Sequence, residues 1–166
     1  MKIFAVSILL CFSALLCAAQ EGKLENTKDM KFTTVPNLPT CVTAAAEEGD
    51  PGNGAAILLL KAKTGCDIPM HWHTTVEKLM MVSGLARLEM KDAKPQIMRP
   101  AAFAIAPSKH PHHFTCVSAC QLYVVTTGAF DIHYVDAKGD EITPEQALKS
   151  GKKAGAHKKP AAKQGD

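Results

Sequence analysis

Residues 65–84 read GCDIPMHWHTTVEKLMMVSG, and three side chains within this stretch are able to bind a metal ion. His71 and His73 are separated by one residue, and Glu77 follows His73 after three more. Side chains alternate between the faces of an extended chain, so a strand over residues 71–82 would present all three on one face. Two imidazoles and a carboxylate that converge form a ligand set suited to a first-row metal. The stretch therefore predicts an extended segment with a metal site on one side.

The rest of the chain contains many short apolar runs separated by turn residues. Runs of this length, bounded by glycine, proline, asparagine or aspartate, favour strands over helices. We expect strands over residues 41–46, 55–63, 85–90, 97–98, 103–106, 114–117, 121–127 and 129–135. Many short strands at close spacing predict an all-β sandwich or barrel.

One helix is predicted near the end of the chain. Thr143, Pro144 and Gln146 supply an N-cap, a proline at the first helical position and a glutamine at N3. Gly151 is expected to end this helix. Residues 151–166, GKKAGAHKKPAAKQGD, offer no apolar face to bury and predict a disordered basic tail.

The first nineteen residues have the features of a secretory signal peptide. Lys2 precedes an apolar run over residues 3–16, and small residues at 17–19 favour cleavage after Ala19. The pattern predicts a periplasmic or secreted protein. An uncleaved anchor is the alternative, although the run is shorter than the roughly 20 residues that span a bilayer. A lipoprotein signal is disfavoured because Leu16 stands where a small residue is needed. No later stretch is apolar enough to span a membrane.

The chain has room for one domain, which we place at residues 38–150 after a polar lead-in over residues 20–37. Residues 20–150 carry 13 basic and 15 acidic side chains, and the excess of lysine lies in the tail. A nearly neutral domain has no field that attracts nucleic acid, so we expect a small-molecule partner and no nucleic-acid partner.

Four cysteines remain after signal cleavage: Cys41, Cys66, Cys116 and Cys120. An even number in an exported protein permits disulfides, although the sequence does not give their connectivity. Cys116 and Cys120 flank a short segment between two apolar runs, so a hairpin turn would bring them face to face. Two free, buried thiols are the alternative.

Two glycines extend the metal-binding pattern to G-x5-H-x-H-x3-E-x6-G, from Gly65 to Gly84. This pattern resembles the first signature motif of the cupin superfamily. The second cupin motif ends in P-x-G-x-x-H, and Pro107 and His112 match its proline and histidine. The resemblance implies a single-domain jelly-roll barrel, also called a double-stranded β-helix. The metal ligands that it implies are His71, His73, Glu77 and His112.

The second motif departs from the cupin pattern. Lys109 stands where cupins usually have glycine, and the Pro-Gly-Asp turn that opens the motif is replaced by PAA at residues 100–102. Three neighbouring histidines are therefore candidates for the fourth metal ligand. Motif spacing favours His112 over His110 and His113.

The stretches LPTCVTAAAEEGDP, MHWH and GAFDIHYVD resemble a group of small, exported, single-domain bacterial cupins. Cupins with this ligand set bind one divalent transition metal (Fe, Mn, Ni, Cu or Zn) and include dioxygenases, oxalate-processing enzymes and isomerases. The resemblance implies a metal-dependent oxidoreductase of dioxygenase type that acts on a small organic substrate, with Glu77 also in a catalytic role as proton carrier. The alternative is a non-catalytic periplasmic protein that binds a metal or small ligand. Cupins often pair through edge strands, which implies a homodimer.

Several other side chains are assigned to faces of the predicted strands. The inward wall near the metal is expected to consist of Leu79, Met81, Phe103, Ile105, Phe114 and Tyr123. Most are apolar, which favours a small, partly hydrophobic ligand. Trp72 lies opposite the metal-binding face and is expected to pack against the second sheet. His133 is expected to be a satisfied or exposed strand residue.

Overall fold

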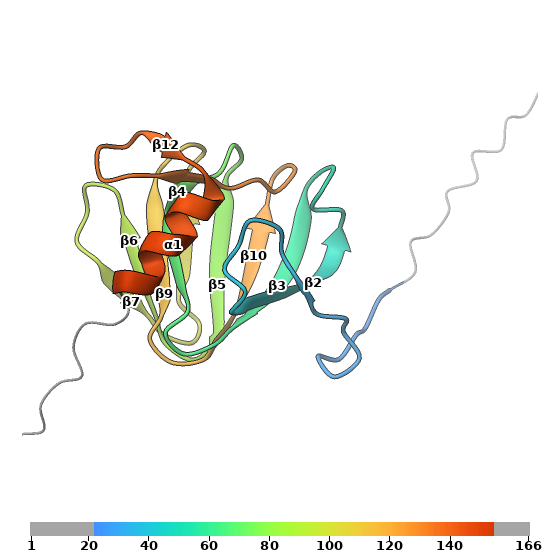
Figure 1. The fold of residues 1–166 in the computed structure, drawn as a ribbon. Coiled ribbons are helices and arrows are strands. Elements are labelled where there is room, and N and C mark those ends of the chain that lie inside the picture. The colour runs from blue at the N-terminus through green and yellow to red at the C-terminus, as the bar shows by residue number, and fades with distance from the viewer. Residues whose placement is uncertain (1–21, 155–166) are drawn as a thin grey trace, which may run out of the picture.

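The computed structural model describes residues 22–154, which form two antiparallel sheets packed face to face with one helix outside them (Figure 1). The strand order is β1-β2-β3-β10-β5-β8 in sheet A and β12-β11-β4-β9-β6-β7 in sheet B. This arrangement confirms the all-β jelly-roll prediction. The expected signal peptide at residues 1–19 and the part of the expected tail after residue 154 lie outside the described residues.

The strand bounds are as follows. Sheet A contains β1 (Thr33–Thr34), β2 (Val42–Gly49), β3 (Ala56–Ala62), β10 (Cys120–Thr126), β5 (Glu77–Ser83) and β8 (Phe103–Ala106). Sheet B contains β12 (Glu141–Ile142), β11 (His133–Val135), β4 (Asp67–Trp72), β9 (His112–Cys116), β6 (Ala86–Met90) and β7 (Gln96–Met98). Within this range, the short strands β1 and β12 are the two that the sequence did not predict.

The core lies between the two sheets because alternate side chains of each strand point inward. In β10, Leu122 and Val124 are buried, whereas Tyr123 and Val125, which alternate with them, are half-buried on the outer face. Facing them from sheet B are Ile68 and other buried apolar side chains. Each fully buried large aliphatic side chain stabilises the fold by roughly 1.5–3 kcal/mol, so this shared interior holds the sheets together.

The predicted strand over residues 71–82 is in fact two strands in opposite sheets. β4 ends at Trp72 and β5 begins at Glu77. The backbone N–H of Thr74 donates to Asp131 Oδ1 at 2.8 Å, and the Ser108 hydroxyl donates to the Thr74 carbonyl at 2.6 Å. Because neighbouring loops satisfy the backbone here, the chain turns from sheet B to sheet A. Both strands face the same core, so His71 and Glu77 still point into one space.

The predicted strand over residues 129–135 is also shorter than expected. Only residues 133–135 pair, as β11, and residues 129–132 form a loop whose Phe130 N–H donates to the Pro51 carbonyl at 2.7 Å. This loop approaches the metal-site end of the barrel, as described below.

The helix α1 (Pro144–Ala154) begins with the predicted capping box. The Gln146 N–H donates to Thr143 Oγ1 at 3.2 Å, and the Thr143 N–H donates to Gln146 Oε1 at 2.9 Å. The helix continues past Gly151, so the prediction that it ends there was wrong; a single helical glycine costs only about 1 kcal/mol. α1 packs against β4 and β11 on the outer side of sheet B (Figure 1). Its residue Ala147 is buried. No helix among residues 22–154 is long and apolar enough to cross a membrane.

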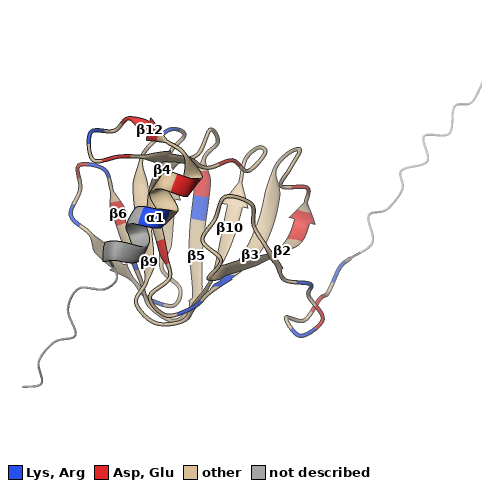
Figure 2. Cartoon of the chain, viewed as in Figure 1, with Lys and Arg blue, Asp and Glu red and all other residues tan. Residues whose placement is uncertain are grey.

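Two disulfides join the sheets at one end of the barrel. Cys41, which precedes β2 of sheet A, pairs with Cys66, which precedes β4 of sheet B. Cys116 at the end of β9 pairs with Cys120 at the start of β10, again linking sheet B to sheet A. The alternative of free thiols is therefore wrong. Charged residues of both signs are scattered over turns and strand ends without a single-sign face in this view (Figure 2).

Candidate metal centre

Four side chains that the sequence singled out meet inside the barrel, at the end opposite the disulfides. His71 lies near the end of β4 and pairs in register with His112, the first residue of β9. His73 follows β4 directly, and Glu77 opens β5 in the other sheet. All four are buried, with 1–5% of their surface exposed. One ring nitrogen from each histidine lies within 4.8 Å of the other two.

Backbone carbonyls fix the orientation of the three imidazole rings. His71 Nδ1 lies 2.7 Å from the Pro69 carbonyl, His112 Nδ1 lies 3.2 Å from that of His110, and His73 Nδ1 bonds the carbonyl of Asp131. A carbonyl oxygen only accepts, so Nδ1 must carry the proton and donate in each ring. The Nε2 lone pair of each neutral ring is then available for a metal, as in most protein metal sites.

Burial favours the neutral form of His71. It moves the pKa of His71 well below its ordinary value, and the neighbouring His112 and His73 add to the shift because a second positive charge would be repelled. A neutral imidazole is the form that binds metal. His71 is therefore in the form that binds a metal at neutral pH.

Glu77 supplies the negative charge of the centre. Its carboxylate lies 3.2 Å from His112 Nε2 and 3.5 Å from His73 Nε2. Burial alone would raise the pKa of Glu77, but the neighbouring His73 and His112 outweigh this effect and bring it below the ordinary value. An anionic oxygen is thus held against two of the three histidines.

The residues present fit a divalent transition metal. His73 Nε2 is buried and has no hydrogen-bond partner among the described residues, which is costly unless a ligand satisfies it. The enclosed space beside His71, Glu77 and His112 measures about 30 Å³, enough for a water-sized group. Three nitrogens and one carboxylate oxygen suit Mn, Fe, Ni, Cu or Zn.

The structure separates the three neighbouring histidines of the second motif. His112 points into the barrel, whereas His113 points outward and lies with Nε2 2.7 Å from Asp67 Oδ1. His110 contributes its backbone carbonyl, which orients His112. Strand alternation explains the difference between His112 and His113, since adjacent residues face opposite sides of a sheet.

The predicted inward wall is only partly right. Leu79, Met81 and Phe114 are buried, but Phe103 and Ile105 are 58% and 47% exposed. Tyr123 is half-buried on the outer face. Pairing decides these positions, because the inward residues Glu77 and Leu79 of β5 lie opposite alanines of β8, which leaves the two large side chains of β8 outside. The inner lining that was missed consists of Leu60, Ile68, Leu122 and Val124.

The loop between β10 and β11 supplies contacts that the sequence did not reveal. The Phe130 ring packs on His73 at 5.1 Å between centroids, and the Asp131 carbonyl orients the same histidine. Trp72 stacks on His133 of the same sheet at 3.9 Å, instead of packing against the second sheet as expected. His133 is half-buried and lies 2.9 Å from Glu141, as expected of a satisfied strand residue. A backbone carbonyl carries no side-chain signal, so Asp131 could not have been found from its residue type.

Comparisons with known proteins show similarity at the level of the fold. No protein-family model and no curated protein matches the chain. Among solved structures, the polyketide cyclase RemF from Streptomyces resistomycificus superposes with a TM-score of 0.61 at 17% identity, over 70% of this chain and 87% of that one. An RmlC-like cupin from Ralstonia eutropha JMP134 gives 0.56 at 19% identity, over 84% and 93%. The DMSP lyase DddQ from Ruegeria pomeroyi DSS-3 gives 0.53 at 17% identity, over 69% and 60%.

The structural matches agree with the arrangement of two antiparallel sheets. The histidines of the metal centre had suggested the same fold through their spacing in the sequence. This chain therefore has the jelly-roll fold of the cupin structures to which it is similar.

Proposed function

We propose that this protein is an exported, metal-dependent cupin enzyme that acts on a small organic substrate, with oxidoreductase chemistry of dioxygenase type as its reaction class. The observation that carries the proposal is the orientation of the three imidazoles. Each Nδ1 is committed to a carbonyl, which leaves three Nε2 atoms to converge on one buried point beside Glu77. Structural matches that are enzymes, a polyketide cyclase and a DMSP lyase, support catalysis on small molecules.

The chain's own residues would do three things in this scheme. His71, His73 and His112 would hold the metal, with Glu77 as a fourth ligand or as the group that holds a proton beside it. The buried lining excludes bulk water, which strengthens each electrostatic interaction inside. A bound divalent metal supplies Lewis-acid polarisation of substrate oxygen atoms and redox chemistry with dioxygen.

A non-catalytic metal-binding or ligand-binding protein is the alternative, and one observation favours it. The space beside the ligands is about 30 Å³, so an organic substrate needs room outside the closed centre. A protein that only retains a metal needs no such room. The two functions differ in whether any compound is consumed.

The test begins with the protein purified under native conditions and its metal identified by mass spectrometry. Oxygen uptake and loss of the added compound are then measured with the metal-loaded protein for thiols, flavonols, diketones and oxalate, with DMSP added because one structural match is a DMSP lyase. We expect one class to be consumed by the parent chain and not by His71→Ala. If no compound is consumed and none changes the spectrum of the metal, the protein is a binder and the enzyme proposal fails.

Export is part of the proposal and rests on residues 1–19 of the sequence. The two disulfides support it, because such bonds persist in oxidising compartments. We expect the protein in the periplasmic or culture fraction, with its N-terminus at Gln20 by mass spectrometry. Intact protein in the cytoplasmic fraction would contradict this part of the proposal.

A further inference from the structure

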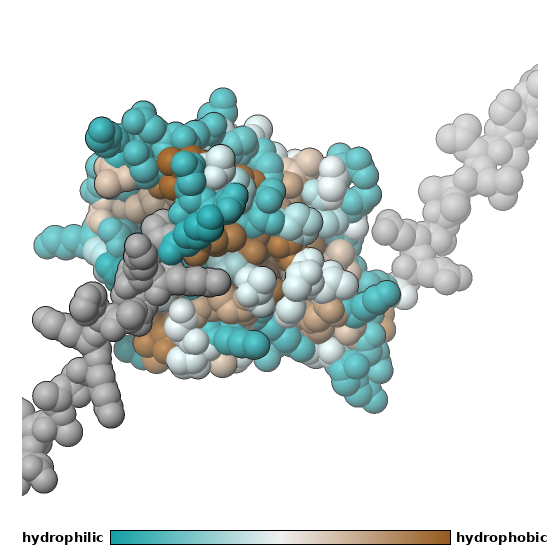
Figure 3. Space-filling view, in the orientation of Figure 1, coloured by the Kyte–Doolittle hydropathy of each residue, from teal (hydrophilic) through white to brown (hydrophobic). Residues whose placement is uncertain are grey.

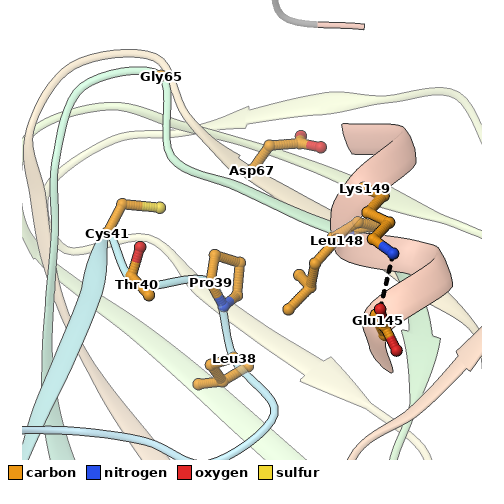
Figure 4. Close-up of a pocket in the computed structure, with 10 residues that line it drawn as sticks. Leu38, Pro39, Thr40, Cys41, Gly65, Asp67, Glu145, Leu148 and Lys149 are labelled. Carbon is orange, nitrogen blue, oxygen red and sulfur yellow. Dashed lines mark hydrogen bonds and ion pairs between the residues drawn. The ribbon is translucent and has the colours of Figure 1, made fainter. Parts of the chain in front are cut away.

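A second hollow lies outside the barrel, between α1 and the segment that leads into β2 (Figure 4). Its volume of about 580 Å³ lies within the range of small-molecule sites. Leu38, Pro39 and Leu148 give it an apolar wall, and Leu148 projects from the helix towards Pro39 in Figure 4. Hydrophobic residues also form a strip beside the helix on the molecular surface (Figure 3). None of the four metal-site residues lines this hollow, so it is a separate feature.

One carboxylate on the lining is held in a fixed orientation. Asp67 Oδ1 accepts hydrogen bonds from His113 Nε2 and from Thr115 Oγ1, each at 2.7 Å. The second oxygen, Oδ2, accepts none from the described residues. A carboxylate has about four acceptor positions, so Asp67 keeps capacity for a further donor without any rearrangement.

Of the three charged side chains that line the hollow, Asp67 is the one available to a ligand. Burial raises its pKa, but the hydrogen bonds from His113 and Thr115 bring the pKa below its ordinary value, so the side chain is ionised at neutral pH. The other two charged side chains of the lining, Glu145 and Lys149, form an ion pair at 2.6 Å and cancel each other. A negative, oriented acceptor beside an apolar wall is complementary to a cation with an apolar body.

We propose that this hollow is a second binding site, which takes a small organic amine. The protonated amine donates to Asp67 Oδ2, and the apolar body packs on Leu38, Pro39 and Leu148. A neutral alcohol of the same shape would keep the packing and a hydrogen bond to Asp67 but would lack the positive charge, and a carboxylate would be repelled by Asp67. The site thus selects by charge at one end and by shape at the other. The proposal is independent of the function assigned to the metal centre.

The test is an NMR titration of the full chain with 2-phenylethylamine, 2-phenylethanol and phenylacetate as three matched probes. We expect the amine to bind about tenfold more tightly than the alcohol, because only the amine pairs a positive charge with Asp67, and phenylacetate not to bind. The shifted amides should be those of residues 38–41, 65–69 and 145–149 other than the prolines. Equal affinity for amine and alcohol, no amine binding, or shifts confined to other residues would each overturn the proposal.

Two variants localise the effect. Asp67→Asn keeps an acceptor for His113 and Thr115 but removes the charge, so amine affinity should fall about tenfold while alcohol affinity falls less. Asp92→Asn, in the turn between β6 and β7, removes an equal charge at a position away from the hollow. It should change neither the amine affinity nor the alcohol affinity. Metal content is measured in parallel and should stay the same in all three proteins. Unchanged amine affinity in Asp67→Asn would contradict the assignment even if the amine binds.

Discussion

His112 and His113 are neighbours in the chain with opposite environments, and this contrast decides which histidine belongs to the metal centre. The side chain of His112 is 1% exposed and lies beside Glu77, whereas that of His113 lies on the outer face against Asp67. The sequence favoured His112 by motif spacing alone. Strand alternation gives the physical reason, because a register shift of one residue would exchange the two.

Replacement of His112 by alanine and replacement of His113 by alanine should therefore have different effects on metal content. We expect His112→Ala to lower metal content at least about tenfold, since removal of even a supporting group commonly costs that much. His113→Ala should retain the metal of the parent chain. The measurement is elemental mass spectrometry on each protein after native purification, with circular dichroism to verify the fold. Equal loss in both variants would show that His112 has no special role.

A backbone detail explains how the second motif survives its substitutions. Lys109 and Ala101 stand where cupins usually have glycine, and their φ angles are +58° and +67°. The glycine-like backbone conformation is thus retained without glycine. A non-glycine residue pays roughly 1–2 kcal/mol to adopt it, so the turns are kept at some cost to stability.

Ala101→Gly should consequently stabilise the protein, by about 0.5–1 kcal/mol after allowance for the added freedom of the unfolded chain. Ala102→Gly is the control, because Ala102 has no positive φ and glycine there should destabilise by a similar amount. Urea unfolding followed by the fluorescence of Trp72, the single tryptophan, gives both free energies. A destabilised Ala101→Gly variant would mean that the turn is not strained.

At the scale of elements, the loop between β10 and β11 closes the metal end of the barrel. Phe130 covers His73, and hydrogen bonds tie the loop to Pro51 and Thr74. We expect Phe130→Ala to speed release of the metal to a chelator about fivefold, because an aromatic contact is worth roughly 1 kcal/mol. Phe103→Ala removes an exposed ring from β8 and is the matched control.

The rate is followed by the colour of a chelator in excess over the metal-loaded protein. Release at the parent rate in Phe130→Ala would show that the metal leaves by another path. Faster release in both variants would instead report a general loss of stability.

At the scale of the whole molecule, the two disulfides hold the sheets together at the end opposite the metal site. The sequence separation is 25 for Cys41–Cys66 and 4 for Cys116–Cys120. In the chain-entropy view, a longer closed loop restricts the unfolded chain more, which gives about 3.5 kcal/mol for the first bond and about 2 kcal/mol for the second. We expect replacement of Cys41 and Cys66 by alanine to lower the thermal unfolding temperature more than replacement of Cys116 and Cys120 by alanine. The reverse order would indicate that native packing around the sulfurs dominates.

The edge of sheet A is the remaining surface of interest for assembly. Among residues 22–154, β8 has a strand partner on one side only, and residues 100–107, PAAFAIAP, carry no charge. Edge strands without charged residues tend to pair with another chain. We expect a homodimer in which two copies of β8 pair, and Ile105→Lys should give monomers in light scattering. Val117→Lys, at an exposed site away from β8, should remain dimeric. A monomeric parent chain would contradict the prediction.

The sequence by itself determined the fold class, three of the four side chains that meet inside the barrel, and the capped helix after Thr143, and it favoured His112 as the fourth side chain. These follow from local patterns: the spacing of His71, His73 and Glu77, short apolar runs between turn residues, and the capping box. The tertiary structure decided what depends on pairing between distant segments. It placed Phe103 and Ile105 outside because β8 pairs with β5, it split residues 71–82 between two sheets, and it brought Asp131 to His73. Side-chain direction in a strand depends on its partner and register, and neither is written in the strand's own residues.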